Sequence, residues 1–458
     1  MVATVITVKD VCFFERPVVL RLPFKFGIVT LQQTPQIYLK VEIEDSLGNR
    51  AIGMTAELLV PKWFDKNKDL TNEQNVEHLR RAVGFAREAA LETSGSAFAI
   101  HHYVQDSVRT SCAAAGLNML VASFGVAQLD KAIMDALCRL HRLSFYDAIR
   151  ANLPGLDDKD FYAGLRPLKN VYARHTVGLL DPLTASDVTV PVQDNLPQTL
   201  EEIIHVYEQR YFKIKVGGDL DADMKRLENI AALLPGDALV TLDGNEQYGD
   251  ANRFLQLLDE MEKSPRLKKL RDAIMYIEQP IHRDQALRSD VFVLADRYPI
   301  ILDESDDSDD VFTRGKALGY SGISSKACKG LYRSLQNAAL AAKWNMTCGA
   351  EKYFLSAEDL TTQAGLAVQQ DLALAALLGL THVERNGHHY VDGMTAERSE
   401  ANVFAKAHAD LYMFESGRCR LKIKKGVIAT TSLDCVGFAS AALPTFDNQA
   451  ISERKAAG

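Results

Sequence analysis

The stretch from Tyr211 to Lys329 constrains the fold more than any other part of the chain. Its short apolar runs each end in, or carry, a charged residue: Lys215, Asp243, Glu278, Asp303 and Lys326. Each run is about as long as a strand, and a helix-length segment separates it from the next. That alternation predicts consecutive βα units around a parallel sheet. In such a sheet, chemistry collects at the carboxyl ends of the strands, where these charges lie.

Similar runs extend the pattern on both sides of this stretch. The additional strand candidates are KNVYARHTVG, NMTCGAE and LTHVERNG, which brings the total to eight. Helical patterns such as LYRSLQNAALAAKW lie between the runs. Eight βα-like units predict a (β/α)8-type barrel, an α/β fold of the TIM-barrel kind.

The chain is long enough for two domains, because its 458 residues exceed what one core usually serves. Residues 1–165 show strand-like runs followed by helical patterns, which predicts an α+β domain. In this part, LPFKFGIVTLQQTP is expected to be a loop. Residues 166–400 carry the barrel pattern, and residues 401–458 form a terminal segment in which the alternation stops.

Net charge, apolar runs and cysteine spacing limit the kinds of partner and the location that we expect for the protein. The formal net charge of −8 argues against nucleic acid or an anionic membrane as the main partner. No apolar run approaches the length of a membrane span, and the N-terminus lacks a signal-peptide pattern. Seven dispersed cysteines without CxxC spacing are typical of reduced thiols. We expect a cytoplasmic homo-oligomer that acts on a small molecule.

Two lysines at the end of the first of these runs are expected to face the barrel interior. Side chains alternate along a strand, so Lys213 and Lys215 point the same way and Ile214 the opposite way. A buried ammonium is unfavourable without compensation, so two interior lysines indicate a function. The alternative is that both side chains snorkel on an edge strand.

Three acids end successive runs and are expected to converge. Asp243, Glu278 and Asp303 would repel one another unless a cation lies among them. Oxygen-only ligands favour a hard ion, which predicts Mg²⁺. Each acid alone could instead cap a helix. Glu304 is a rival to Asp303, and Asn245 is positioned to support the site.

Lys326 belongs to the same series, because it follows the next apolar run. The alternative is an exposed lysine in a turn, which is what we expect of Lys329. Together with four other strand-end charges in register, Lys326 is better explained as part of a site.

These motifs resemble those of the enolase superfamily, in the branch that contains muconate-lactonizing enzymes, dipeptide epimerases and o-succinylbenzoate synthases. The motifs are KIK at 213–215, DGN at 243–245, IEQP at 277–280, LDES at 302–305 and SSKACKG at 324–330. The resemblance is specific over about 200–330. It is weaker over 120–150, where Met134 takes the place of the usual Trp.

The resemblance implies a modified (β/α)7β barrel and a capping α+β domain, which residues 401–458 complete. It also implies one Mg²⁺ held by Asp243, Glu278 and Asp303, and acid/base lysines on opposite faces of the substrate. Lys215 and Lys326 match the positions of those lysines. Superfamily members use a Lys or His base with Mg²⁺.

The chemistry of these groups suits removal of a proton alpha to a carboxylate. The resulting enediolate carries extra negative charge on oxygen, which a divalent ion stabilises. The base must be neutral near pH 7, so we expect the pKa of its lysine to fall. Lys213 is expected to stay charged and to bind the substrate carboxylate.

Other candidates concern the substrate end of the site. Glu351 is predicted to be a polar strand-end residue, and the absence of His from NMTCGAEKYF disfavours a His-base racemase. The residues around Phe24 to Phe26 either close the site or anchor a local loop. Two interpretations, substrate contact or ordinary polar residue, stay open for a further set: His175, Glu384, Asn386, His388 and His389.

The sequence therefore predicts a Mg²⁺-dependent isomerase or lyase that yields an epimer, a cycloisomer or a dehydrated acid. A sugar-acid dehydratase is one alternative, and a catalytically idle barrel that serves as a binding protein is another. A phosphoryl-transfer enzyme is disfavoured, because no Gly-rich phosphate loop is present.

Overall fold

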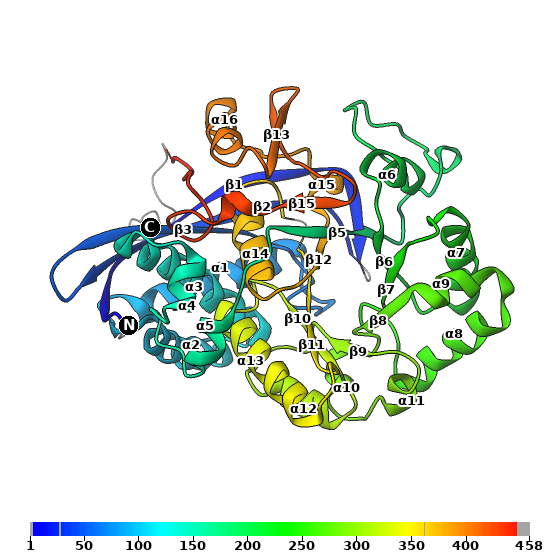
Figure 1. Ribbon diagram of the computed structural model, residues 1–458, viewed down its shortest axis with the longest axis horizontal. Coiled ribbons are helices and arrows are strands. Elements are labelled where there is room, and N and C mark those ends of the chain that lie inside the picture. The colour runs from blue at the N-terminus through cyan, green and yellow to red at the C-terminus, as the bar shows by residue number, and fades with distance from the viewer. Residues whose placement is uncertain (1–2, 27–28, 361, 447–458) are drawn as a thin grey trace.

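The computed structural model describes residues 3–26, 29–360 and 362–446. An antiparallel sheet opens the chain, in the order β3-β2-β1-β4. Its strands are β1 (Ile6–Phe26), β2 (Val29–Asp45), β3 (Arg50–Leu58) and β4 (Ser94–Gly95). The hairpin of β1 and β2 reaches from the N-terminal helices to the barrel (Figure 1).

The stretch expected to be a loop belongs to this hairpin, so that prediction is wrong. Phe24 pairs with Leu31, and both are buried. Their apolar side chains face the core while neighbours face outward, which is the period of a half-buried strand. Gly27 and Ile28, in the same stretch, lie outside the described residues.

Five helices of the described chain follow β3 before the barrel begins, and the third of them packs directly on β2 and β3. They are α1 (Asn72–Ala90), α2 (Ala97–Ala114), α3 (Met119–His141), α4 (Phe145–Arg150) and α5 (Lys159–Gly164). Thr71 caps α1 with a reciprocal Gln74 contact, and Asn118 caps α3. At Gly53 the sheet approaches α3 so closely that a Cβ would lie 2.2 Å from the Ala132 carbonyl oxygen. Only glycine fits there.

Eight parallel strands of the described chain then close into a barrel through the pairing of β12 with β5. They are β5 (Asn170–Val177), β6 (Tyr211–Lys215), β7 (Leu239–Asp243), β8 (Ile274–Glu278), β9 (Ile300–Leu302), β10 (Gly322–Ser325), β11 (Phe354–Ala357) and β12 (His382–Arg385). A short strand, β15 (Val427–Ala429), adds to β5 in the antiparallel direction. The modified barrel with an α+β cap is thereby confirmed.

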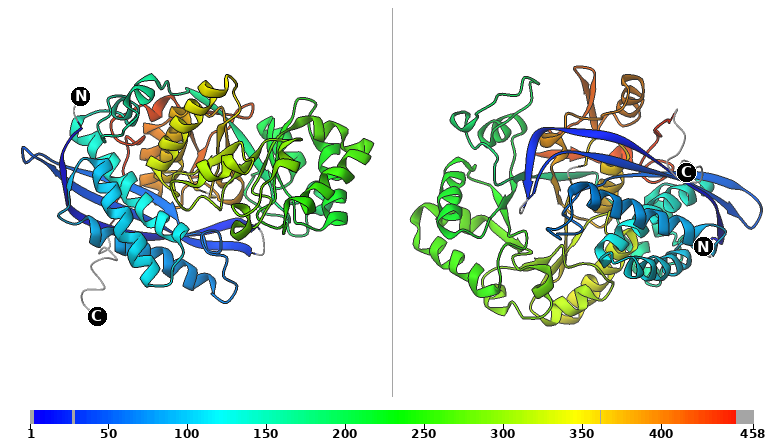
Figure 2. Two further views of the ribbon diagram at one scale, coloured as in Figure 1. Left: turned by 90° about the horizontal axis from the view of Figure 1, so that it is seen from below. Right: turned by 180° about the vertical axis from the view of Figure 1, so that it is seen from behind.

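Helices surround the barrel (Figures 1 and 2). They are α6 (Leu200–Tyr207), α7 (Leu220–Leu233), α8 (Ala251–Lys263), α9 (Lys268–Ala273), α10 (Arg283–Ala286), α11 (Phe292–Ala295), α12 (Val311–Ala317), α13 (Leu331–Cys348), α14 (Leu366–Leu377), α15 (Gly387–Tyr390) and α16 (Arg398–Ala407). A hairpin follows, formed by β13 (Tyr412–Glu415) and β14 (Arg418–Leu421). In the described chain, no helix is both long and apolar enough to cross a bilayer.

The seventh barrel strand is not where the sequence placed it. The first four residues of the run NMTCGAE form the last turn of α13. Gly349, with a φ of 66°, then ends the helix. The strand is instead Phe354–Ala357, because the helical period of α13 continues through Cys348. This shift moves the candidate residues at the strand's carboxyl end.

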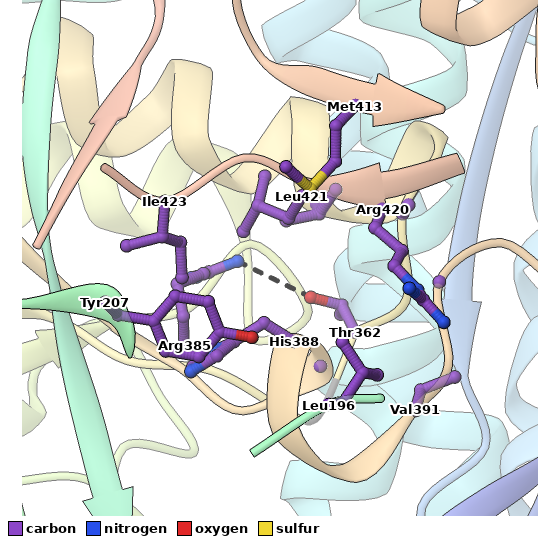
Figure 3. Close-up of a pocket in the computed structure, with 14 residues that line it drawn as sticks. Leu196, Tyr207, Thr362, Arg385, His388, Val391, Met413, Arg420, Leu421 and Ile423 are labelled. Carbon is purple, nitrogen blue, oxygen red and sulfur yellow. Dashed lines mark hydrogen bonds between the residues drawn. The ribbon is translucent and has the colours of Figure 1, made fainter. Parts of the chain in front are cut away.

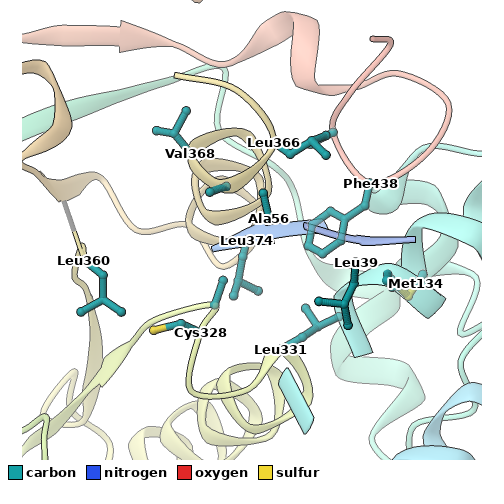
Figure 4. Close-up of a cluster of buried hydrophobic side chains, with 14 of the residues drawn as sticks. Leu39, Ala56, Met134, Cys328, Leu331, Leu360, Leu366, Val368, Leu374 and Phe438 are labelled. Atoms are coloured by element: carbon teal, nitrogen blue, oxygen red, sulfur yellow. The ribbon is translucent and has the colours of Figure 1, made fainter. Parts of the chain in front are cut away.

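The N-terminal sheet and the barrel share one hydrophobic core (Figure 4). Leu39 and Ala56 come from the sheet, whereas Leu331 and Leu374 come from barrel helices α13 and α14. Phe438, from the C-terminal segment, packs into the same cluster. The capping elements are therefore fixed to one side of the barrel by burial of apolar surface.

Candidate active site

The carboxyl ends of the barrel strands enclose a cluster of charged side chains. Lys213 and Lys215 both point inward, and they are 1% and 6% exposed. Ile214, between them, joins the core on the outer side of the barrel. The predicted alternation therefore holds, and snorkelling on an edge strand does not occur.

The three predicted acids come from adjacent strands. Asp243 and Glu278 are paired across β7 and β8, and Asp303 directly follows β9. All three are buried. They do not cap helices, since the residue that caps the helix after β7 is Asp250.

Lysines neutralise these acids. Lys215 Nζ donates to Asp243 Oδ2 at 2.6 Å, and Lys326 Nζ donates to Asp303 Oδ2 at 2.6 Å. Burial alone would raise the pKa of both carboxyls, but the neighbouring ammonium groups outweigh it and hold both below their ordinary values. Lysine ammonium groups are therefore the cations that neutralise Asp243 and Asp303 in the structure.

Lys213 lies among four carboxylates. Its Nζ donates to Glu278 Oε1 at 2.7 Å, Glu358 Oε2 at 2.9 Å and Glu384 Oε2 at 3.0 Å, and it lies 3.0 Å from Asp243 Oδ2. Burial opposes its charge, but these acids raise its pKa well above the ordinary value. Protein acids accept its protons in the structure, and its expected contact with a substrate carboxylate stays a prediction.

Lys326 is held in its charged form. Burial acts to lower its pKa, but Asp303 outweighs burial and the pKa lies above its ordinary value. The Trp63 ring also lies 4.2 Å from Lys326 Nζ, where its π face favours a cation. The expected fall in pKa is therefore wrong for this lysine in the state described.

Lys329 is buried and not an exposed turn residue, which corrects the prediction made for it. Its Nζ donates to Ser324 Oγ at 2.7 Å and lies 2.9 Å from Asp306 Oδ2. Lys329 therefore places a positive charge beside the carboxylate of Asp306.

The donor set suits a hard divalent ion in one respect. Glu278 Oε2 is buried with no hydrogen-bond partner, and burial together with Asp243 raises the pKa of Glu278 well above its ordinary value. Glu304 Oε2 is likewise buried without a partner, and its pKa is raised to about 7, chiefly by burial. A cation would relieve both groups. As the side chains stand in the described chain, no three Asp, Glu, His or Cys residues are arranged to hold a metal.

Sequence reasoning missed Glu358 and its partner Arg174, and it left the role of Glu384 open. Glu358 directly follows β11, and Arg174 on β5 forms a buried ion pair with it. Glu384 on β12 binds Lys213 and accepts a 2.5 Å hydrogen bond from Thr176. The run FLSAED, an apolar strand followed by two acids, carried the same signal as the earlier strands and could have identified Glu358.

Two substrate-binding candidates lie elsewhere. Glu351 precedes β11, at the opposite end of that strand from the carboxyl-end charges, and it is exposed. The error follows from the misplaced seventh strand. His175 is buried on β5 but alternates with the inward-facing Arg174 and Thr176, so its ring contacts His389 outside the barrel.

The central pocket has the expected lysines on its walls. It is lined by apolar and charged side chains: Phe24, Val60, Trp63, Lys213, Lys215, Asp243, Asn245, Asp303, Lys326, Asp359, Leu360, Glu384 and Asn386. Asn245 Nδ2 donates to Glu304 Oε1 at 3.2 Å. Phe24, from the β1–β2 hairpin, reaches this pocket, and its ring packs against Tyr390 at 4.3 Å.

Lys215 and Lys326 stand on opposite sides of this pocket. They belong to β6 and to the end of β10, the second and sixth strands of the closed ring. Two proton-carrying groups thus flank a space whose remaining wall is partly apolar. The arrangement suits proton transfer at either face of a small molecule.

A second cavity lies outside the barrel, beside β12 and the β13–β14 hairpin (Figure 3). His388, Tyr207 and Arg385 line it together with aliphatic residues such as Leu421 and Ile423. His388 therefore does not line the central pocket, whereas Glu384 and Asn386 do.

Comparison with known proteins agrees with this geometry. The family model described as enolase C-terminal domain-like matches residues 198–407. The resemblance inferred from the motifs is thereby confirmed, with muconate cycloisomerases, racemase-type proteins and epimerases of the superfamily among the structural neighbours. No curated protein matches the chain.

Solved structures extend the likeness to almost the whole chain. The 2-chloromuconate cycloisomerase from Rhodococcus opacus 1CP is 17% identical, with a TM-score of 0.63, covering 95% of this chain and 97% of its own. The L-Ala-D/L-Glu epimerase from Bacillus subtilis is 14% identical, with a TM-score of 0.62 and coverages of 96% and 100%. An enolase-superfamily member from Roseovarius nubinhibens ISM, solved with magnesium, is 17% identical, with a TM-score of 0.61 and coverages of 96% and 96%. At these identities the likeness shows the enolase-type fold.

Proposed function

We propose that the protein is an isomerase or lyase that removes the alpha proton of a small carboxylate substrate. The observation that carries this proposal is the placing of Lys215 and Lys326 on opposite sides of the central pocket, with strand-end acids between them. Relatives with the same fold include cycloisomerases and epimerases, which supports the reaction class.

The two lysines would divide the proton transfers. Lys326, held charged by Asp303, is set to donate a proton from Nζ to a carbanionic intermediate. Lys215, once neutral, would accept the substrate's alpha proton at Nζ from the other face. Its neighbour Asp243 Oδ2, 2.6 Å away, would stabilise the ammonium that results.

Mg²⁺ is part of this proposal, with Asp243, Glu278 and Asp303 as the residues that would hold it. When bound, such an ion supplies positive charge that stabilises an enediolate oxygen. The unpartnered Glu278 Oε2 supports this assignment, and so do relatives crystallised with magnesium. Lys213 would remain the counterion of Glu358 and Glu384, next to the metal ligands.

The pocket walls exclude water from the reacting atoms. Phe24 comes from the N-terminal hairpin, Trp63 from the turn after β3, and Leu360 from the loop after β11. An apolar cover strengthens electrostatic effects inside the site. These side chains would contact the non-reacting body of the substrate.

A screen for proton exchange tests the proposal. The protein is incubated in D₂O with a library of small carboxylic acids, with Mg²⁺ and without it, and mass spectrometry measures deuterium at the alpha carbon. We expect exchange into at least one acid, dependent on Mg²⁺ and lost in Asp243→Asn. Glu57→Gln is a matched control, because Glu57 is also buried and paired with a lysine, Lys131 at 3.0 Å, outside the site.

One result would count against the proposal, and a second would narrow it to one reaction. No exchange into any acid, together with binding of acids in the pocket, would favour the idle barrel. Loss of a beta hydroxyl from sugar acids would direct the assignment to a dehydratase, in which Lys326 could act as the acid at the leaving group.

A further inference from the structure

A short segment of the N-terminal domain lies against the barrel mouth. Residues 61–68 connect β3 to α1, and they carry Trp63 into the central pocket. Trp63 is only 5% exposed, and its ring lies over Lys326. We call residues 61–68 the covering segment, because it forms an apolar wall over one of the two lysines.

One acidic side chain of the barrel holds the covering segment. Glu246 is buried and accepts hydrogen bonds from Arg283 Nε at 2.7 Å and from Nη2 at 2.9 Å, and it forms an ion pair with Lys66. Arg283 in turn donates to the carbonyl oxygens of Trp63 at 2.9 Å and Phe64 at 3.1 Å. Glu246 is thus connected to the segment twice, through Arg283 and through Lys66.

The turn after β7, which carries Glu246, has an unusual backbone conformation. Asn245 and Glu246 have φ values of 42° and 67°, in the left-handed region that non-glycine residues rarely adopt. Such conformations persist only where the surrounding structure holds them, and they gather at functional sites. Lys66 Nζ also donates to the Asn245 carbonyl oxygen at 3.1 Å, so two consecutive residues of this turn contact the segment.

The segment has other anchors within its own domain. Asn118 Nδ2 donates to the Phe64 carbonyl oxygen at 3.0 Å, and the Phe64 ring packs against Phe124 at 4.9 Å. These contacts do not involve the barrel. Removing Glu246 would therefore loosen the attachment of the segment to the barrel without removing the packing that folds it.

We propose that Glu246 is a positioning residue: it fixes Trp63 over Lys326 by binding Arg283 and Lys66. The carboxylate acts through the covering segment and does not touch the reacting atoms. For the proposed function, this positioning would keep Trp63 as an apolar wall of the pocket and would restrict the access of water to Lys326. The placing of Trp63 can be measured without a substrate, so its test is separate from that of the proposed function.

Tryptophan fluorescence provides the test, because the chain has two tryptophans, Trp63 and Trp344. In a Trp344→Phe background, Trp63 is the sole reporter. Glu246→Gln keeps the shape but removes the charge that holds both partners. We expect quenching of Trp63 by acrylamide to increase about tenfold, the change in open population that one lost charge-assisted hydrogen bond produces. The emission maximum should shift to longer wavelength.

Controls separate positioning from general loosening. Glu400→Gln in the same background removes a comparable bidentate ion pair, with Arg16 at 2.7 and 2.9 Å, far from the pocket, and should leave Trp63 protected. Lys66→Met removes the segment's own partner and leaves the Arg283–Glu246 pair intact, so it tests the same idea if Glu246→Gln does not fold. It should increase quenching less than Glu246→Gln does.

Unchanged quenching in folded Glu246→Gln, or in Lys66→Met if the first variant does not fold, would overturn the proposal. An equal increase in Glu400→Gln would overturn it too, because exposure would then reflect general destabilisation. With a substrate in hand, Glu246→Gln should raise KM more than it lowers kcat, and Glu246→Asp should restore part of the loss. An effect confined to kcat would contradict a positioning role.

Discussion

The inner and outer faces of β5 and β12 bury titratable side chains in opposite ways. On the inner face, Arg174 and Glu384 are charged and paired, with Glu358 and Lys213 as partners. On the outer face, His175 contacts His388 and His389, and burial lowers the pKa of His175 to about 3. The pKa values of the other two histidines also lie well below their ordinary value, chiefly through burial.

The difference teaches that burial alone does not decide the charge of a group. Opposite charges within hydrogen-bond distance keep Arg174 and Glu384 ionised, whereas the three outer histidines have no such partner among the described residues and are neutral. His388 Nδ1 and His389 Nδ1 are buried without a hydrogen-bond partner. Alternate residues of one strand therefore belong to two different electrostatic environments, and only the inner one suits proton transfer.

The largest effect is expected from the lysines of the inner face. With a substrate in hand, Lys326→Ala should lower turnover by about 10²- to 10⁴-fold, the usual contribution of a general acid or base. Lys215 should still exchange deuterium into one enantiomer, and Lys215→Ala should show the converse. Chiral analysis with mass spectrometry measures both.

Lys131→Met is the control for those variants, because Lys131 is also buried and paired with an acid, but lies outside the pocket. It should leave exchange in both enantiomers intact wherever it folds. Turnover by Lys326→Ala at the wild-type rate would show that Lys326 is structural and that the two-base mechanism is wrong.

A smaller effect, on stability, is expected from breaking the inner pairing. Arg174→Met leaves Glu358 buried without its guanidinium partner, which should lower the free energy of unfolding by about 3–5 kcal/mol. Urea denaturation measures the change. Adding Glu358→Gln should recover part of it, because the buried carboxylate that lost its guanidinium partner and kept only Lys213 is then gone.

Arg210→Met provides the exposed comparison, since the Arg210–Asp237 pair at 3.2 Å lies at the surface, and we expect a change of less than about 1 kcal/mol. If Arg174→Met were no more destabilising than this variant, the inner pairing would not stabilise the fold.

The smallest effect concerns pH and the outer face. The pKa of His175 is about 3 in the folded state, against about 6.5 in the unfolded state. Above pH 6.5 the side chain is neutral in both states, so its burial does not lower the free energy of unfolding. Stability is lost as the pH falls through 6.5 towards 3. His175→Leu should therefore reduce the stability difference between pH 7 and pH 5 by about 1–2 kcal/mol. Urea denaturation at the two pH values measures it, and an unchanged pH dependence would mean that His175 can be protonated in the folded state.

The sequence predicted the charged ends of β6 to β9 well, because each of these strands is a clear apolar run that ends in, or is followed by, a charged residue. Lys213 and Lys215 share a face by alternation alone, and the structure bears this out. His175 was different, since alternation within β5 does not tell which residues face inward until β5 is placed against β6. Glu351 was misplaced because the end of a helix and a short strand look alike in sequence.

Ion pairing was the least predictable feature of the site. Long side chains carry their charges several bonds from the backbone, so the sequence could not show that Lys213 would meet acids from the last two strands. For the same reason Lys329 was expected at the surface, although it reaches Asp306 below the strand ends.

The hydrophobic core shared by the N-terminal sheet and the barrel has a consequence for motion. Opening the site by a hinge between the two parts would expose Leu39, Ala56 and the barrel side chains that cover them, and water contact with that apolar surface is unfavourable. A substrate would therefore enter by displacement of a small piece, such as the turn that carries Trp63. The shared core also couples the folding of the two parts. A barrel expressed without residues 1–165 would expose the apolar surface that the N-terminal sheet covers, and it would tend to aggregate.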